Sequence, residues 1–173
     1  MLIRNALVAD ASAIARLNVD TWRSSYCGLV PEEYLAGLSY GVKENAFREL
    51  LLNQQNGTFG LVAETAGEIV GHLFAGPERE GNQNYRAEIF AIYVSKEHQS
   101  QGIGLVLMKE SFHILRQAGH DSVMLWTPAA SPYQGFYKKL GGTVIGRNKF
   151  PLTEGMILDL VGYGWKDLDL TSV

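Results

Sequence analysis

Hydrophobic residues recur with helical spacing in the first third of the chain. Ile14, Leu17 and Trp22 share one face of a helix that follows Asp10, a residue type that favours helix N-caps. A further helix is expected to open at Pro31, because proline suits the first helical position. Helical periodicity then continues toward the Asn-Gly turn at residues 56–57.

Strand-like patterns dominate from residue 59 onward. Two apolar, β-branched runs joined by a short turn predict a hairpin over residues 59–64 and 68–75. Further strands are expected at 87–94, 123–127, 143–145 and 155–161, with helices at 104–118 and after Ser131-Pro132. This order of elements predicts an α/β domain, in which helices cover both faces of a mixed sheet.

Composition narrows the class of protein. The chain has 173 residues, 46% of them hydrophobic and 19% charged, which is ordinary for one globular domain spanning residues 1–173. Its net charge of −3 argues against a nucleic-acid partner, since such partners bind through a broad positive field. No apolar run approaches the roughly 18 residues of a membrane-spanning helix, so no membrane partner is expected. The single cysteine, Cys27, cannot form an internal disulfide, and we expect a reducing, cytoplasmic location.

The segment that carries chemistry lies between the strand at 87–94 and the helix that follows it. Its residues Gln99-Ser100-Gln101-Gly102-Ile103-Gly104 lead into that helix. Glycines at such a junction let the backbone approach a ligand closely, and the unpaired N–H groups of the first helical turn bind an anion such as a pyrophosphate. Leu105-Val106 replaces the Lys-Ser/Thr of a P-loop, and Leu107 replaces the third glycine of a Rossmann fingerprint. Taken alone, the spacing is also typical of a tight strand-to-helix turn.

Two motifs in the same order resemble the GNAT superfamily of N-acetyltransferases. The spacing Gln99-x-x-Gly102-x-Gly104 is similar to that family's Q/R-x-x-G-x-G/A signature, directly after a strand that ends in Tyr93-Val94. Downstream, Gly135-Phe136-Tyr137-Lys138-Lys139-Leu140-Gly141 resembles the family's helix and turn after the fifth strand. The resemblance implies a mostly antiparallel mixed sheet of about seven strands, whose fourth and fifth strands splay apart.

The resemblance also implies acetyl-CoA as cosubstrate, and no metal. The pantetheine arm would lie in the splay along the backbone of Ile92, Tyr93 and Val94, with an amide near Ile92 polarising the acyl carbonyl. The other cofactor-binding residues that it implies are Gln99, Gln101, Gly102, Ile103, Gly104, Leu105 and Ser131. One departure concerns an asparagine that the family places seven residues before its tyrosine to touch the CoA arm, because that position is Ala130 here.

The implied reaction is direct transfer of an acetyl group from the thioester to a primary amine, without a covalent enzyme intermediate. Tyr137 matches the family's thiolate-protonating tyrosine, and a packed helix aromatic is the alternative interpretation. Glu88 matches a position where some members place a glutamate that acts as base through water, and an exposed strand-edge carboxylate is its alternative. Strict alternation would place Glu88 on one strand face with Phe90 and Ile92, unless a bulge intervenes. His72 is a second candidate base, or a structural histidine.

The acceptor pocket of the family lies between the first two helices, the fourth strand and the last two strands. The substrate-binding candidates that this implies are Trp22, Tyr26, Tyr85, Phe90, Trp126 and Phe150, each of which is equally suited to core packing. The acceptor itself stays open among a small polyamine, an amino acid, an antibiotic and a protein N-terminus. A homodimer, common in the family, is one candidate assembly. A CoA-binding sensor without turnover is the alternative function.

Overall fold

The structure is a computed structural model that describes residues 1–54, 56–153 and 155–169. The helices are α1 (Ala11–Ser25), α2 (Glu32–Gly37), α3 (Tyr40–Leu52), α4 (Ile103–Gln117) and α5 (Gln134–Lys139), with short 3-10 turns η1 (Val8–Asp10) and η2 (Lys96–His98). The strands are β1 (Leu2–Asn5), β2 (Phe59–Thr65), β3 (Glu68–Pro77), β4 (Ala87–Val94), β5 (Val123–Pro128), β6 (Thr143–Thr153) and β7 (Met156–Trp165).

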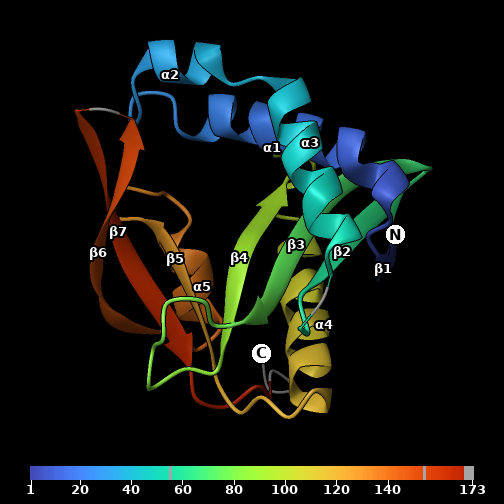
Figure 1. Ribbon diagram of the computed structural model, residues 1–173, viewed down its shortest axis with the longest axis vertical. Coiled ribbons are helices and arrows are strands. Elements are labelled where there is room, and N and C mark those ends of the chain that lie inside the picture. The colour runs from blue at the N-terminus through green and yellow to red at the C-terminus, as the bar shows by residue number, and fades with distance from the viewer. Residues whose placement is uncertain (55, 154, 170–173) are drawn as a thin grey trace.

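All of these strands join one mixed sheet in the order β1-β2-β3-β4-β5-β7-β6 (Figure 1). Neighbouring strands are antiparallel except β4 and β5, which run parallel and are connected through α4. The prediction of an α/β domain with a mostly antiparallel mixed sheet is therefore confirmed. The parallel pair is central to the sheet, so the connection that carries the glycine motif crosses the middle of the molecule.

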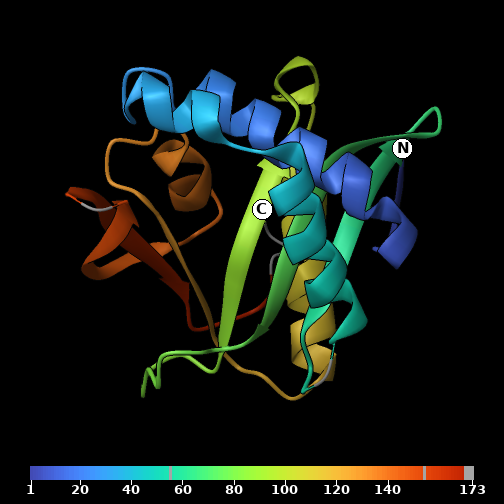
Figure 2. The same ribbon diagram turned by 45° about the horizontal axis from the view of Figure 1, so that its top comes forward.

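Helices cover the two faces of the sheet differently. Figure 2 shows α1 and α3 in front of β3 and β4, with α4 behind them. Behind the sheet, Leu107 and Phe112 of α4 are fully buried against β2, β3, β4 and β7. In front, Ile14 of α1 packs into a second cluster with Phe74 of β3. Burial of these apolar stripes, worth about 1.5–3 kcal/mol for each large side chain, holds both layers on the sheet.

Three local expectations were wrong. The helix after Ser131 does not begin there, because the Ser131 hydroxyl accepts a hydrogen bond from Tyr133 N (3.2 Å) within a turn, and α5 begins only at Gln134. Asp10 precedes α1 without capping it, since its carboxylate instead accepts bonds from Leu7 N and Arg4. Strands β6 and β7 extend well beyond the predicted ranges 143–145 and 155–161. Most of β6 is exposed at the sheet edge, so its sequence lacks the alternation on which strand prediction depends.

Among the described helices, none combines the length and apolar character that a membrane-crossing helix needs.

Candidate active site

The site is an opening between β4 and β5. The two strands pair only from Ala87 to Ile89 on β4 and from Val123 to Leu125 on β5, although both continue further. Beyond this point they diverge, and a cavity of about 370 Å³ occupies the opening. Its lining comes from α1, β4, the loop into α4, β5 and α5: Thr21, Ser25, Tyr26, Ile92, Tyr93, Val94, His98, Gln99, Ser100, Gly102, Ile103, Gly104, Leu105, Thr127, Tyr133, Phe136 and Tyr137.

A β-bulge turns the side chains of β4. Ala75 pairs with Ile89 and Phe74 pairs with Ala91, so Phe90 is the extra residue. Phe90 packs with the cluster in front of the sheet, whereas Ile92 packs with the cluster behind it. The expectation from strict alternation, that Ile92 shares a face with Glu88, is therefore wrong, because the inserted residue reverses the order of faces. The backbone of β4 beyond the bulge lacks a β5 partner within the described register and faces the opening.

The loop into α4 forms one end of the cavity. Gly102 precedes the helix with φ +83°, a left-handed conformation that favours glycine, and an added Cβ there would meet no atom within 4 Å. The first N–H groups of α4, at Ile103, Gly104 and Leu105, have no intrahelical acceptor by the geometry of a helix start. The structure thus places four of the predicted cradle residues at the cavity, with the partial positive charge of a helix N-terminus.

The remaining predicted cofactor-binding residues differ in where they lie relative to the cavity. The Gln99 side chain lines the cavity and its Nε2 donates to the carbonyl of Val94 (3.1 Å). Gln101 is exposed, and its amide donates to Glu97 O (3.0 Å) instead of facing the cavity. Ser131 is buried in the turn before α5 and is absent from the described cavity lining. Gly104 is held close to α5, since an added Cβ would lie 3.1 Å from Cζ of Phe136.

Tyr137 lies on the opposite wall of the cavity, on α5. Burial raises the pKa of its phenol, and a hydrogen bond with the side chain of Thr127 opposes part of that effect on the pKa. Its ring packs 5.5 Å from that of Tyr163, centroid to centroid. At neutral pH the phenol therefore keeps its proton, which suits a proton donor.

A hydrogen-bond network spans the cavity and was missed by the sequence analysis. The hydroxyl of Tyr133, just before α5, is 2.7 Å from Ser25 Oγ of α1 and donates to Gln99 Oε1 (3.2 Å). This network ties the first helix, the loop into α4 and the segment before α5 together. No local pattern marks Ser25 or Tyr133 as partners, because they are 108 positions apart in the chain.

The candidate bases stand outside the described cavity lining. The Glu88 carboxylate is buried on β4 and accepts two bonds from Arg79, from Nε (2.9 Å) and from Nη2 (2.7 Å). His72 is fully buried between the rings of Phe47, Phe74 and Tyr93. Burial lowers the pKa of His72 to about 3, so its imidazole is neutral near pH 7.

The aromatic candidates for acceptor binding divide into two groups. Tyr26 lines the cavity, and Trp22 borders it by donating its indole N–H to the Tyr93 hydroxyl (3.0 Å). Phe90 and Trp126 lie on the strands that flank the opening, where the Trp126 ring packs over Gly162. The other two lie elsewhere: Tyr85 is buried against Gly164 of β7, and Phe150 is half exposed on β6.

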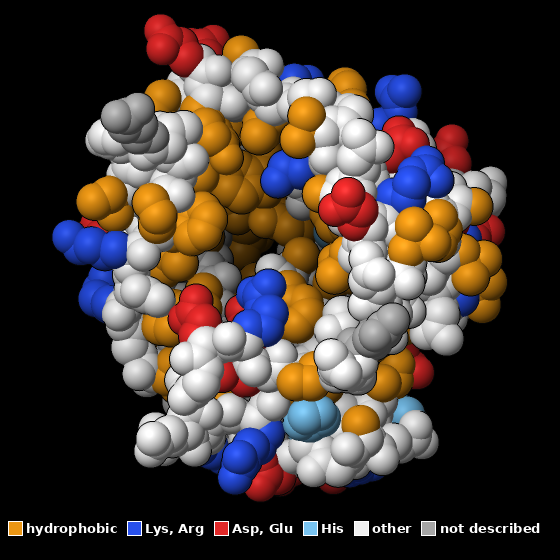
Figure 3. Space-filling model, in the orientation of Figure 1, with side chains coloured by type: hydrophobic (Ala, Val, Ile, Leu, Met, Phe, Trp, Pro, Cys, Tyr) orange, Lys and Arg blue, Asp and Glu red, His pale blue; other side chains and the backbone are white. Residues whose placement is uncertain are grey.

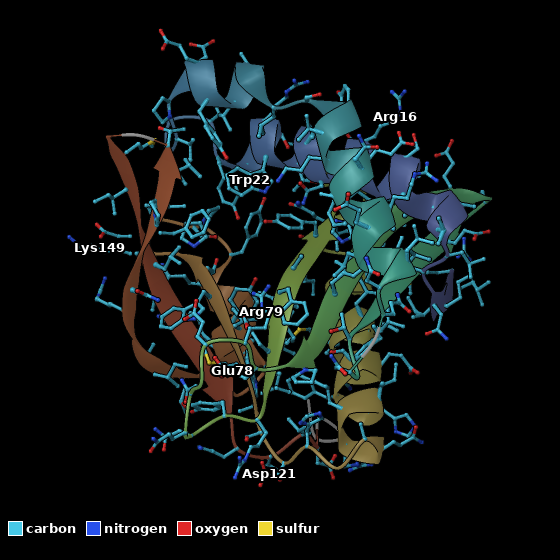
Figure 4. The ribbon with its side chains drawn as sticks, viewed as in Figure 1. Arg16, Trp22, Glu78, Arg79, Asp121 and Lys149 are labelled. Atoms are coloured by element: carbon cyan, nitrogen blue, oxygen red, sulfur yellow. The ribbon has the colours of Figure 1, made fainter. Side chains whose placement is uncertain are left out.

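The front face of the molecule is hollowed at the opening. Figure 3 shows a hollow lined mainly by hydrophobic side chains, and Figure 4 places Trp22 above it and Arg79 below it in the same orientation. We call this concavity, between Trp22 and Arg79, the acceptor hollow. No grouping of three or more histidine, cysteine or acidic side chains suited to hold a metal occurs in the part of the chain that the structure describes.

A sheet opened between parallel strands, with a glycine-led helix start at the opening, defines the class of acyltransferases with the N-acetyltransferase fold. Comparison with known proteins agrees, since the model of the acetyltransferase (GNAT) family matches residues 19–142. The chain therefore belongs to the GNAT family of acetyltransferases. It is 31% identical, over 96% of its length and 93% of the relative's, to the uncharacterized N-acetyltransferase YuaI of Bacillus subtilis (strain 168).

Two solved structures share the fold. The PaiA N-acetyltransferase from Thermoplasma acidophilum, in complex with coenzyme A, superposes with a TM-score of 0.75 at 20% identity, covering 92% of this chain and 96% of that one. YncA, a putative acetyltransferase from Salmonella typhimurium with its cofactor acetyl-CoA, gives a TM-score of 0.71 at 22% identity, covering 98% and 94%.

Proposed function

We propose that this acetyltransferase moves an acetyl group directly from acetyl-CoA to a primary amine. The observation that carries the proposal is the opening between β4 and β5, which has the N-terminus of α4 at one end and the buried phenol of Tyr137 on its wall. PaiA and YncA, which share this fold, hold coenzyme A and acetyl-CoA respectively.

The residues at the opening fit the parts of this cosubstrate. The amides of residues 102–105 at the start of α4 suit the negatively charged pyrophosphate, and the open space beside Gly102 leaves room for it. The free edge of β4 after the bulge offers backbone groups to the two amides of the pantetheine arm. Ala130 supplies no side-chain hydrogen bond to that arm. The Tyr133 hydroxyl offers a polar group in this segment that lines the same cavity, whereas the adjacent Ser131 is absent from the described lining.

The proposed acetyl transfer needs few groups from the protein. A neutral amine attacks the thioester carbonyl, the new C–N bond replaces the C–S bond, and the sulfur leaves as a thiolate. Tyr137 donates its proton to that thiolate, the cationic nitrogen of the tetrahedral intermediate releases a proton to water, and solvent returns a proton to the Tyr137 phenol, so no net proton is gained or lost. Glu88, the first candidate base, is absent from the described cavity lining and accepts bonds from Arg79 at both oxygens, so the amine proton passes to water instead. His72 also fits the role of base poorly, because both of its ring nitrogens are buried without a hydrogen-bond partner in the described structure.

Thiol release from acetyl-CoA over a panel of primary amines tests the proposal. We expect release that depends on the amine and exceeds the hydrolysis seen without one, with the acetylated amine identified by mass spectrometry. Heat of acetyl-CoA binding without turnover for any amine would favour the alternative, a CoA-binding sensor. Absence of any binding heat would contradict both functions.

A further inference from the structure

The ion pair between Arg79 and Glu88 lies at the acceptor hollow. The Glu88 side chain is 7% exposed, whereas that of Arg79 is 58% exposed. The two bonds use Nε and Nη2 of the guanidinium and both carboxylate oxygens of Glu88. Nη1 takes no part in either bond. The carboxylate is thus covered by a cation whose outer side faces solvent at the lower margin of the hollow (Figure 4).

A second contact fixes Arg79 in this position. Its guanidinium carbon lies 3.9 Å from the centroid of the Phe90 ring, within the range of a cation–π contact. Phe90 is the residue that the bulge inserts into β4, and it projects on the same side of the sheet as Glu88. Arg79 comes from the segment between β3 and β4, so the strand and its preceding loop hold the pair together.

The rest of the hollow supplies apolar surface. Above it, α1, α2 and the β6–β7 hairpin meet in a cluster whose members are Trp22, Tyr26, Leu29, Val30, Tyr34, Leu35, Leu38, Tyr93, Leu152, Met156 and Leu158. Glu88 is the one acid among the described residues of β4, and the nearby Glu78 carboxylate is already bonded to the backbone N–H groups of Glu80 and Asn82 (Figure 4). Arg79 already occupies both oxygens of Glu88.

We propose that Arg79 is a specificity-determining residue: by covering Glu88, it makes the acceptor hollow select amines with an apolar body and no second positive charge. A diamine would bring its distal ammonium toward the Arg79 guanidinium instead of toward a free carboxylate, and these like charges repel each other. An arylalkylamine places only apolar atoms there. The inference rests on the proposed function, because it names the class of amine that the same site accepts.

Removal of Arg79 tests this selectivity. The probes are 2-phenylethylamine and 1,5-diaminopentane, which differ in the group at the far end from the reacting amine. For each we would measure kcat/KM by thiol release, and Kd by calorimetry on the protein saturated with coenzyme A. In Arg79→Gln we expect the ratio of diamine to arylalkylamine to rise at least about tenfold in either measurement, because Glu88 is left free.

Two further variants separate charge from space. Arg79→Gln/Glu88→Gln should return the ratio to the wild-type value, since the freed carboxylate is gone. Arg86→Gln removes an exposed arginine of the same loop that directly precedes β4 and interacts with Asp121, and should leave the ratio unchanged. A ratio that does not move in Arg79→Gln, or one that stays raised in the double variant, would overturn the proposal.

Two outcomes call for a second measurement: a variant that does not fold, and a protein that acetylates neither probe. If Arg79→Gln does not fold, Glu88→Gln leaves Arg79 unpaired and should lower the ratio about tenfold, and an unchanged ratio overturns the proposal. If the protein acetylates neither probe, the proposed function is in question, but the two Kd values on the coenzyme A complex still decide whether Arg79 sets the selectivity.

Discussion

Tyr137 is the proposed proton donor at the opening between β4 and β5. Its ring is buried among Phe136, Tyr163 and Trp165, and the residue lines the cavity. Tyr137→Phe should therefore keep the packing and remove the proton donor. We expect kcat to fall by about 100-fold, within the range for loss of general acid catalysis, with an unchanged Kd for coenzyme A. Stopped-flow thiol release and calorimetry measure the two quantities.

A matched control is available one ring away. Tyr163→Phe also removes one buried hydroxyl, which donates to Gln134 Oε1 (2.9 Å) and does not line the described cavity. This variant should retain most of the wild-type kcat. Equal turnover by Tyr137→Phe and the wild type would exclude Tyr137 as the proton donor.

The raised pKa of Tyr137 also predicts the shape of the pH profile. A phenol whose pKa lies above its ordinary 10.0 keeps its proton throughout the neutral and moderately alkaline range. We expect kcat/KM to rise with pH as the acceptor amine loses its proton, and then to level off without a decline below about pH 10. A descending limb near pH 8 would show that a different group donates the proton.

The buried His72 should make the stability of the fold depend on pH. Because its pKa is about 3 when folded and 6.5 when unfolded, the unfolded chain binds the extra proton between these values. Stability from this group is present above pH 6.5 and declines as the pH falls toward 3. Between pH 7 and pH 5, the unfolding free energy of the wild type should therefore fall by about 2 kcal/mol more than that of His72→Leu.

Urea denaturation at the two pH values measures this difference. His113→Gln serves as the control for the loss of a histidine at an exposed position of α4. Parallel loss of stability in the wild type and in His72→Leu would mean that His72 is protonated within the fold.

Among the elements, α4 packs against α5 at Gly104. A Cβ there would lie 3.1 Å from Phe136, and the next residue on α5 is Tyr137. Gly104→Val should push this helix outward and weaken acetyl-CoA binding about tenfold, because the two helices flank the same cavity. A side chain at this position could also fill the place of the pyrophosphate, but the added Cβ points at the ring of Phe136.

A second-site change distinguishes these two causes. Phe136→Leu shortens the ring that the valine would meet, so Gly104→Val/Phe136→Leu should recover part of the lost affinity. Gly135→Ala adds a methyl group to the same helix where no atom lies within 4 Å, and should bind acetyl-CoA as the wild type does. Without recovery in the double variant, the steric contact with Phe136 is not the cause. Calorimetry with acetyl-CoA gives each affinity.

Element types could be predicted from local sequence, but some boundaries could not. Helix α4 was expected at 104–118 and spans Ile103–Gln117, since its apolar stripe and terminating glycine are local signals. The start of α5 was displaced because Ser131 closes a turn instead of capping a helix. The bulge at Phe90 depends on the register with β3, and register is set by a partner strand that the local pattern does not specify.

At the scale of the molecule, the order of local patterns predicted an α/β domain with a mixed sheet and a glycine-led helix start, whereas the mostly antiparallel arrangement and the splay were implied by the family resemblance of the two motifs. The contacts that shape the site join distant parts of the chain. Ser25 meets Tyr133, and Trp22 meets Tyr93, 71 positions away. The loop that carries Arg79 has no recognisable sequence pattern. Its bonds to Glu88 in the folded chain are what identify this residue.

The arrangement of the whole molecule predicts how its stability responds to cosubstrate. Binding at the opening joins β4, α4 and α5, which otherwise meet across a cavity, so acetyl-CoA should stabilise the fold as one unit. At about 100 times Kd the gain is about 2.7 kcal/mol, which raises Tm by roughly 5–10 °C for a chain of this size. Gly102→Val is the control, because a β-branched residue is strained at φ +83° and would distort the start of α4. Differential scanning calorimetry should show the shift in the wild type and little of it in the variant, and equal shifts would place the thioester elsewhere on the protein.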